Sequence, residues 1–225
     1  VLAIAKAMPE PQAAGKKGGG GKAAKRRPAE AADAEEEAAE PEPAVAAKKN
    51  ILVVGGTSTG KTTLTNALLA EVASTSDRVV LIEDTLELQC AAPNLVSLRT
   101  KDGVATLSDL VRSALRLRPD RIPIGEVRGA EALDLLKAWG TGHPGGVGTL
   151  HAGSALGTLR RLEQLIQESV VTVPRALIAE TIDIIAVLVR DGTGRRLAEL
   201  AEVRGLDAAG EYVLAPLPST TGDHS

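Results

Sequence analysis

The 225-residue chain is poor in aromatic residues, with no Phe and only one Trp and one Tyr. A core must therefore be built from aliphatic side chains, which a hydrophobic content of 44% can supply. The single cysteine, Cys90, excludes an internal disulfide framework and fits a reducing compartment. No apolar run approaches the roughly 20 residues that span a bilayer. The net charge of -3 gives the chain no overall attraction to nucleic acid.

The first residues, VLAIAKAMPEP, are too short and lack the basic start of a secretory signal, so we expect a cytoplasmic protein. The chain begins with Val rather than Met, which is consistent with a fragment of a longer protein.

Residues 1–47 are of low complexity, with a basic block followed by an acidic block in a background of Ala, Gly and Pro. Burial of so few apolar side chains does not repay the entropy of ordering, so we expect a disordered tail. Two roles stay open: a basic arm that tethers the chain to DNA or anionic lipid, and a plain solvated linker, which we favour.

From Lys48 onward strand and helix signals alternate, which predicts an α/β fold with a mainly parallel sheet. We expect strands at 50–54, 78–82, 95–99, 121–125 and 146–150, and helices at 61–73, 106–117, 129–139, 154–168 and near Pro174. Residues 184–190 and 195–203 predict an antiparallel hairpin, followed by a short strand at 212–214. The expected domain spans residues 48–215, and residues 216–225 form a flexible tail.

One stretch carries a specific motif. An apolar strand-like run ends at Val54 and leads into G-x-x-x-x-G-K-[ST], directly before a helix-like run. Glycines allow backbone N–H groups to face an anion, and the first turn of the helix adds unpaired N–H groups. We expect Lys61 to reach the β- and γ-phosphates and Thr62 to help hold Mg²⁺. The expected ATP-binding residues are Gly55, Gly56, Thr57, Ser58, Thr59, Gly60, Lys61, Thr62 and Thr63.

Polar side chains follow three further expected strands. In open parallel sheets ligands bind outside the carboxyl ends of the strands. Glu126 is expected to orient or deprotonate the attacking water and, with Thr62, to be associated with Mg²⁺. Glu83 and Asp84 would polarise the water or bind the metal through water, or alternatively cap the next turn. His151 would hydrogen-bond the γ-phosphate, with a purely structural role equally open.

Four arginines are candidates to neutralise phosphate charge, within the subunit or across a subunit boundary like an arginine finger. The alternative for each is a solvated surface charge. The four arginines are Arg99, Arg112, Arg116 and Arg128. We expect His143 to organise its loop and Trp139 to lie in the core.

Four stretches resemble the signature regions of the type II/type IV secretion ATPases: GGTSTGKTT, VVLIEDTLEL, LRLRPDRIPIGEVRGAEALDLLKAWGTGHPGG and VGTLHAGSALGTLRRLEQLI. Within that superfamily the chain, from Lys48 to about Leu214, is most similar to the conjugal transfer ATPases of the TrbB type. The resemblance implies a RecA-like P-loop NTPase core, with a mainly parallel sheet flanked by helices, that uses ATP and Mg²⁺. It further implies a homo-hexameric ring, peripheral at the cytoplasmic face of the inner membrane, which powers a conjugative pilus or channel.

The resemblance also implies roles for particular residues. Lys61 and Thr62 match the Walker A pair, Glu83 the acidic-box glutamate and Glu126 the Walker B glutamate. His151 matches the histidine-box residue, and Arg128 the arginine just after Walker B.

Two departures from the family pattern stand out. The family carries a folded N-terminal domain, where this chain has the low-complexity tail. Pro123 occupies an aliphatic position in the Walker B strand, where a proline removes a ladder donor and could misplace Glu126.

Three functions remain open: the motor of a conjugative type IV system, an ATPase of a type II or pilus system, and a non-hydrolysing nucleotide-binding scaffold or remnant. Sequence-specific binding of nucleic acid is not expected, since the chain from Ile51 onward carries 17 basic against 21 acidic residues.

Overall fold

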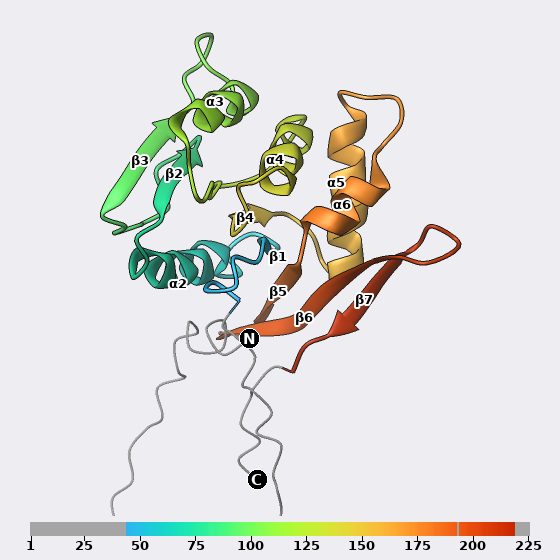
Figure 1. The fold of residues 1–225 in the computed structure, drawn as a ribbon. Helices are drawn as coiled ribbons and strands as arrows, with labels where there is room; N and C mark the ends of the chain where they lie inside the picture. The colour runs from blue at the N-terminus through green and yellow to red at the C-terminus, as the bar shows by residue number, and fades with distance from the viewer. Residues whose placement is uncertain (1–43, 193, 219–225) are drawn as a thin grey trace, which may run out of the picture.

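The computed structural model of the chain describes residues 44–192 and 194–218 (Figure 1). Most of the expected N-terminal tail, residues 1–43, and residues 219–225 of the C-terminal tail lie outside the described residues.

The described elements follow the expected alternation of strands and helices. In chain order they are β1 (Ile51–Gly55), α2 (Lys61–Ala73), β2 (Arg78–Glu83), β3 (Asn94–Arg99), α3 (Leu107–Ala114), the 3₁₀ turn η1 (Leu115–Leu117), α4 (Glu131–Gly140), β4 (Val147–Leu150), α5 (Ala155–Gln167), α6 (Arg175–Thr181), β5 (Ile184–Asp191), β6 (Gly194–Leu206) and β7 (Tyr212–Pro216).

The sheet is mainly parallel on one side and antiparallel on the other. Its larger part has the order β4-β1-β5-β6-β7, with β1 parallel to β4 and β5. Strands β5, β6 and β7 pair antiparallel, and β2 and β3 form a separate parallel pair. The α/β fold with a mainly parallel sheet and a C-terminal antiparallel hairpin is therefore confirmed.

Residues 121–124 join the two parts of the sheet, although they form only isolated bridges and not the regular strand expected at 121–125. Val79 and Ile82 of β2 bridge to this segment in parallel, and Ile124 bridges to Gly148 of β4 on its other side. The segment therefore occupies the position of a central strand between β2 and β4.

Pro123 explains why this central segment is irregular. Along its β2 side, the amides of Arg121 and Gly125 donate to the carbonyls of Arg78 and Ile82. Residue 123 is the intermediate position, where the ring nitrogen of proline has no hydrogen to donate. The neighbouring amide of Ile124 faces β4 and donates to Val147, so one ladder bond is lost while the register continues. The expectation that Pro123 could misplace Glu126 is not met in this geometry.

Replacing Pro123 with valine is expected to restore that ladder bond. The new amide should be protected from hydrogen exchange to an extent similar to that of Ile124, and unfolding free energy should change by less than about 1 kcal/mol, because the hydrogen bond offsets the entropy gained by the unfolded chain. Hydrogen exchange measured by NMR checks this. An unprotected amide at residue 123 would contradict the ladder assignment.

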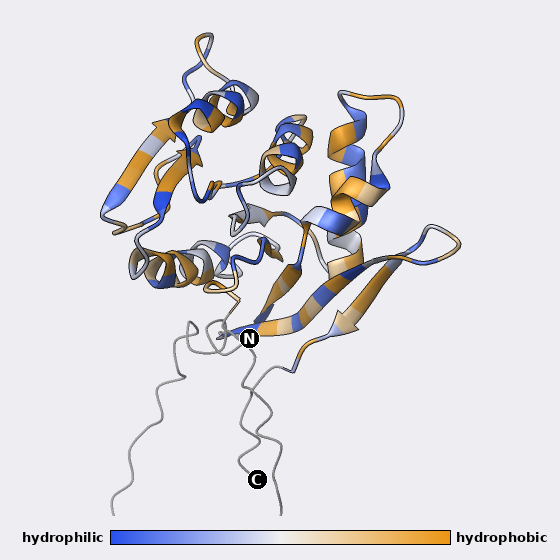
Figure 2. Cartoon of the chain, in the orientation of Figure 1, coloured by the Kyte–Doolittle hydropathy of each residue, from blue (hydrophilic) through white to orange (hydrophobic). Residues whose placement is uncertain are grey.

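The two faces of the sheet are covered unequally. Residues such as Leu52 and Val54 point into a large core formed with α3, α4, α5 and α6. Ile51 and Val53 point to the other face, where α2 is the only helix among the described residues. Figure 2 shows the apolar character of the central strands. Within the described part of the chain, no helix is both long enough and apolar enough to cross a membrane.

Helix starts agree with local chemistry. Thr106 and Asp109 form a reciprocal capping box at the start of α3, and Ser154 accepts from the Gly157 amide at the start of α5. Trp139 is 2% exposed in the core, as expected, and its Nε1 donates to the Ile122 carbonyl. This bond fixes α4 against the central segment 121–124.

The packed domain extends beyond the expected limits of 48 and 215. Ala44 and Val45 are buried against the α2 face of the sheet, and the Ala44 carbonyl accepts from the Lys49 amide. At the other end, Leu217 packs on the same core, and its amide donates a hydrogen bond to the Leu200 carbonyl. Residues 44–47 and 217 therefore belong to the folded unit and not to the tails.

Candidate functional site

The loop between β1 and α2 is shaped to present backbone amides. Gly60 has φ +96°, a conformation that favours glycine, and a Cβ at Gly55 would collide with the Leu188 carbonyl and the Thr59 hydroxyl. Thr59 itself holds the loop by donating to the Gly56 carbonyl at 3.0 Å. No side chain caps α2 and no acidic residue lies in its first turn, so these amides stay available to an anion.

Lys61 and Thr62 lie at this helix start. Lys61 Nζ donates to the carbonyls of Gly55 and Gly56, at 3.0 and 2.9 Å, which folds the side chain back over the loop. Burial lowers the pKa of the Lys61 ammonium below its ordinary value, partly opposed by the charges of Glu126 and Glu87. A partly desolvated cation in a ring of amides is suited to bind phosphate.

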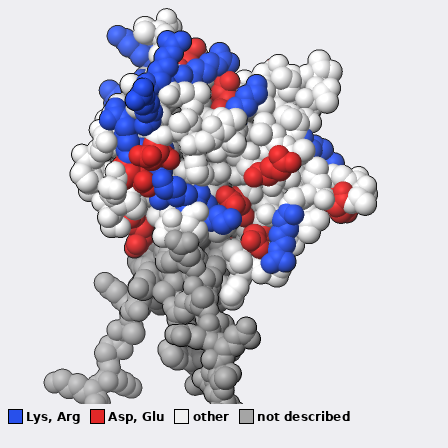
Figure 3. Space-filling view, viewed as in Figure 1, with Lys and Arg blue, Asp and Glu red and all other residues white. Residues whose placement is uncertain are grey.

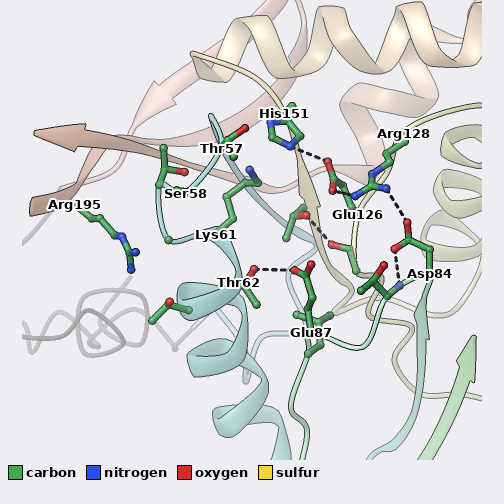
Figure 4. A pocket seen from close by; sticks show the side chains of 17 residues that line it. Thr57, Ser58, Lys61, Thr62, Asp84, Glu87, Glu126, Arg128, His151 and Arg195 are labelled. Carbon is green, nitrogen blue, oxygen red and sulfur yellow. Dashed lines mark hydrogen bonds and ion pairs between the residues drawn. The ribbon is translucent and has the colours of Figure 1, made fainter.

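A second group of side chains comes from the ends of β2, the 121–124 segment and β4 (Figure 4). Glu126 Oε2 is 2.6 Å from Arg128 Nη2, and Glu126 Oε1 is 3.0 Å from His151 Nε2. Arg128 Nη1 also reaches Asp84 Oδ2 at 2.8 Å. Hydrogen bonding to Glu126, more than any other contact, raises the pKa of Arg128. These four expected residues meet in one network.

The backbone around the network is fixed by neighbouring side chains. Glu131 accepts from the amides of Arg128 and Gly129 at 2.6 and 2.9 Å, and Thr149 donates to the Gly125 carbonyl at 2.6 Å. The turn that carries Glu126 and Arg128 is thus held between α4 and β4.

Glu83 does not lie where the sequence places it. Its side chain is 2% exposed, and Oε1 accepts from the amides of Glu87 and Leu88 at 3.0 and 2.8 Å. A buried carboxylate with two amide donors organises the loop after β2, which is the capping alternative. Glu83 is absent from the lining of the cleft described below.

Two charged lining residues were not foreseen from the sequence. Glu87, four residues after Glu83, is exposed and its Oε2 accepts from the Thr62 hydroxyl at 3.2 Å. The sequence feature that could have indicated Glu87 is the cluster of three acidic residues in Glu83-Asp84-Thr85-Leu86-Glu87. Arg195 comes from the start of β6, and no local sequence signal connects it with the loop at Gly60.

These groups line one cleft of 430 Å³, a volume typical of a small-molecule site. Thr57 to Thr63 line it, whereas the expected residues Gly55 and Gly56 do not. The other lining residues are Asp84, Thr85, Glu87, Leu88, Gly125, Glu126, Arg128, Thr149, His151 and Arg195.

The remaining arginine candidates lie elsewhere. Figure 3 shows Lys and Arg side chains gathered over the part of the molecule that holds α3. Arg99, Arg112 and Arg116 are exposed and do not line the cleft, and Arg112 pairs with Asp134 at 2.9 Å. His143 Nδ1 lies 2.7 Å from the Pro119 carbonyl oxygen, which agrees with a loop-organising role.

The donor set fits a Mg²⁺ ion associated with phosphate. Within residues 44–192 and 194–218, no group of three or more His, Cys, Asp or Glu is arranged to hold a metal alone. Mg²⁺ keeps several waters and takes phosphate oxygens, so a hydroxyl and one or two carboxylates are sufficient. Thr62, Glu87 and Glu126 offer these oxygen ligands at the cleft.

The parallel sheet, the glycine-rich loop at the start of α2 and the carboxylate at the end of the adjacent segment define a RecA-like P-loop NTPase core. Residues 31–207 match the Type II/IV secretion system protein family, and the chain belongs to this family.

Named relatives agree with this assignment. The chain is 52% identical over 155 residues to the conjugal transfer protein TrbB of Rhizobium radiobacter, covering 68% of this chain and 48% of that protein. Over 122 residues it is 43% identical to the type IV secretion system protein VirB11 of Bartonella quintana, covering 52% of this chain and 34% of that protein. The chain spans about half the length, or less, of the relatives it matches.

Solved structures show the same core. The VirB11 ATPase from the Brucella suis type IV secretion system, in complex with sulphate, superposes with a TM-score of 0.65 at 34% identity, covering 71% of this chain and 49% of that one. The pilus retraction motor PilT with bound ADP superposes with a TM-score of 0.55 at 25% identity, covering 76% of this chain and 48% of that one. The folded part of the chain therefore has the fold of these two ATPases.

Proposed function

We propose that the chain is the ATP-binding and ATP-hydrolysing core of a motor subunit in a conjugative type IV secretion system. The observation that carries the proposal is the convergence of Lys61, Thr62 and Glu126 on one cleft at the carboxyl ends of the strands. The 52% identity to a conjugal transfer protein favours conjugation over a type II or pilus system.

Phosphate would be bound by the start of α2. Lys61 would exchange its bonds to the Gly55 and Gly56 carbonyls for the β- and γ-phosphate oxygens. Bound Mg²⁺ would neutralise charge that develops on the phosphate oxygens. Thr62 and Glu126 would hold it, the latter directly or through water.

Glu126 would orient or deprotonate the attacking water. Both of its oxygens have partners, Arg128 on one side and His151 on the other. Each oxygen keeps a second lone pair that could accept the proton of the water, and Arg128 is also anchored through Asp84. His151 would then be positioned to hydrogen-bond the γ-phosphate.

Glu87 takes over the role at the cleft that the sequence assigns to Glu83. Its carboxylate accepts from the hydroxyl of Thr62, so it would help Thr62 to hold Mg²⁺, directly or through water. Glu83 supports this indirectly, because its two amide bonds fix the backbone of Glu87 and Leu88.

We further propose a homo-hexamer that associates peripherally with inner-membrane components of the secretion apparatus. The exposed Arg99, Arg112 and Arg116 would lie at the boundary between subunits and supply positive charge to a neighbour's nucleotide. This also accounts for their distance from the cleft of their own chain.

Steady-state ATPase activity of the purified chain tests the proposal, with Lys61→Ala as the control. We expect turnover that requires Mg²⁺ and is lost in Lys61→Ala together with ATP binding. Tight ATP binding without turnover would instead support the non-hydrolysing scaffold. The contacts of both Glu126 oxygens with Arg128 and His151 favour that second candidate.

A further inference from the structure

Arg195 lies on the side of the phosphate loop away from the catalytic network. In the sheet, β4 and the 121–124 segment lie on one side of β1, whereas β5 and β6 lie on the other. Figure 4 shows the consequence: Glu126, Arg128 and His151 lie on one side of Lys61, and Arg195 on the other.

The side chain of Arg195 runs along the loop. A Cβ built on Gly60 would lie 3.0 Å from Arg195 Cδ, 3.8 Å from Nε and 3.9 Å from Nη1. Arg195 is exposed and lines the cleft. Among residues 44–192 and 194–218 its guanidinium has no hydrogen bond or ion pair, unlike that of the adjacent Arg196, which pairs with Asp191 at 3.2 Å.

The position of the catalytic network sets the direction of a bound nucleotide. The γ-phosphate must point toward Glu126 and His151, because the water that attacks it is activated there. The nucleoside end must then leave the loop on the side of β5 and β6. Arg195 is the cationic side chain that lines the cleft on this side.

We propose that Arg195 is the nucleoside clamp of this site, with its guanidinium packed on the base ring of the bound nucleotide. The assignment rests on the proposed function. A guanidinium is planar and weakly hydrated, and it stacks on aromatic rings in a way that an ammonium does not. The ligand class is therefore a base-bearing nucleotide, and the residue acts on affinity and not on the chemical step.

Isothermal titration calorimetry of the whole chain with ATP, ADP and inorganic tripolyphosphate tests this. Arg195→Ala should weaken the affinity for ATP and for ADP by the same factor, about 10-fold. The affinity for tripolyphosphate, which has no base, should change by less than about 2-fold. Because the chemical step is untouched, kcat should stay within about 2-fold and KM for ATP should rise. Arg195→Lys should bind like Arg195→Ala.

Arg196→Ala is the matched control, since it removes the same charge from the neighbouring position and should leave all three affinities unchanged. An equal loss of tripolyphosphate affinity in Arg195→Ala, or full recovery of ATP affinity in Arg195→Lys, would overturn the clamp in favour of a charge contact to phosphate. Unchanged ATP affinity in Arg195→Ala would overturn it outright while leaving the proposed function standing. Failure of the parent chain to bind ATP would overturn both.

Discussion

Replacing Glu126 with glutamine is expected to lower ATP turnover by about 100-fold or more, because a positioned general base contributes at least that factor. Glutamine keeps the shape of the side chain but cannot accept a proton. Its amide can still meet His151 or Arg128, so the fold of the network should persist. ATP affinity should change by less than about 3-fold, because phosphate is bound mainly at the start of α2. Single-turnover hydrolysis and calorimetric titration with ATP measure the two effects separately.

Glu87→Gln is the informative comparison, since Glu87 lies at the same cleft but contacts Thr62 rather than Arg128. We expect it to raise the Mg²⁺ concentration needed for turnover. Full activity of Glu126→Gln together with loss of turnover in Glu87→Gln would show that Glu87 is the base and that our assignment of Glu126 is wrong.

Replacing Asp77 with asparagine is expected to lower the free energy of unfolding by about 3 kcal/mol, because it leaves a buried cation without its partner. Arg121 is 2% exposed, and its Nε lies 2.6 Å from Asp77 Oδ2. Arg121 begins the central segment 121–124, which leads to Glu126, so this ion pair anchors the amino end of the segment. Urea unfolding at pH 7 measures the loss.

Lys48→Ala is the control, since Lys48 is the other partner of Asp77 and its side chain is 38% exposed. It should cost less than about 1 kcal/mol. An equal loss in both variants would mean that burial of Arg121 is not the source of the effect.

The same ion pair gives a pH signature. Burial by itself raises the pKa of Asp77, but hydrogen bonds from Arg121 and Lys48 outweigh it, so the pKa in the folded state lies below its ordinary value. The stabilisation is therefore complete above the ordinary pKa of about 4 and is lost as the pH falls through the lower, folded-state value. The stability difference between the parent and Asp77→Asn should be constant from about pH 7 to 5 and shrink below about pH 4. A difference that shrinks toward alkaline pH would contradict this.

The parts of the site that depend on local geometry were predictable from sequence. The phosphate loop is one continuous stretch between a strand and a helix, and the Thr106–Asp109 capping box is equally local. Glu126 and His151 were predicted as site residues because each follows a parallel strand position, and such positions share one edge of the sheet.

The sequence was least informative where the direction of a side chain depends on the path of a loop. Glu83 and Glu87 are equally plausible acids in sequence, and only the fold of residues 84–88 decides which one is buried and which one reaches Thr62. Arg195 depends on the way a distant hairpin packs beside the loop, for which a single sequence carries no local signal. For Pro123, the sequence shows that one backbone amide donor is lost. Only the structure shows that the ladder continues at Ile124 and Gly125.

Helix α2 combines two roles in this structure. Its first turn is the proposed anchor for phosphate, and Leu64, Leu68 and Val72 along its length bury the face of the sheet that no other described helix covers. Local opening of that face and release of nucleotide are then linked equilibria. An anion held at one end of α2 slows detachment of the whole helix, so the bound state should resist proteases and solvent exchange throughout that layer.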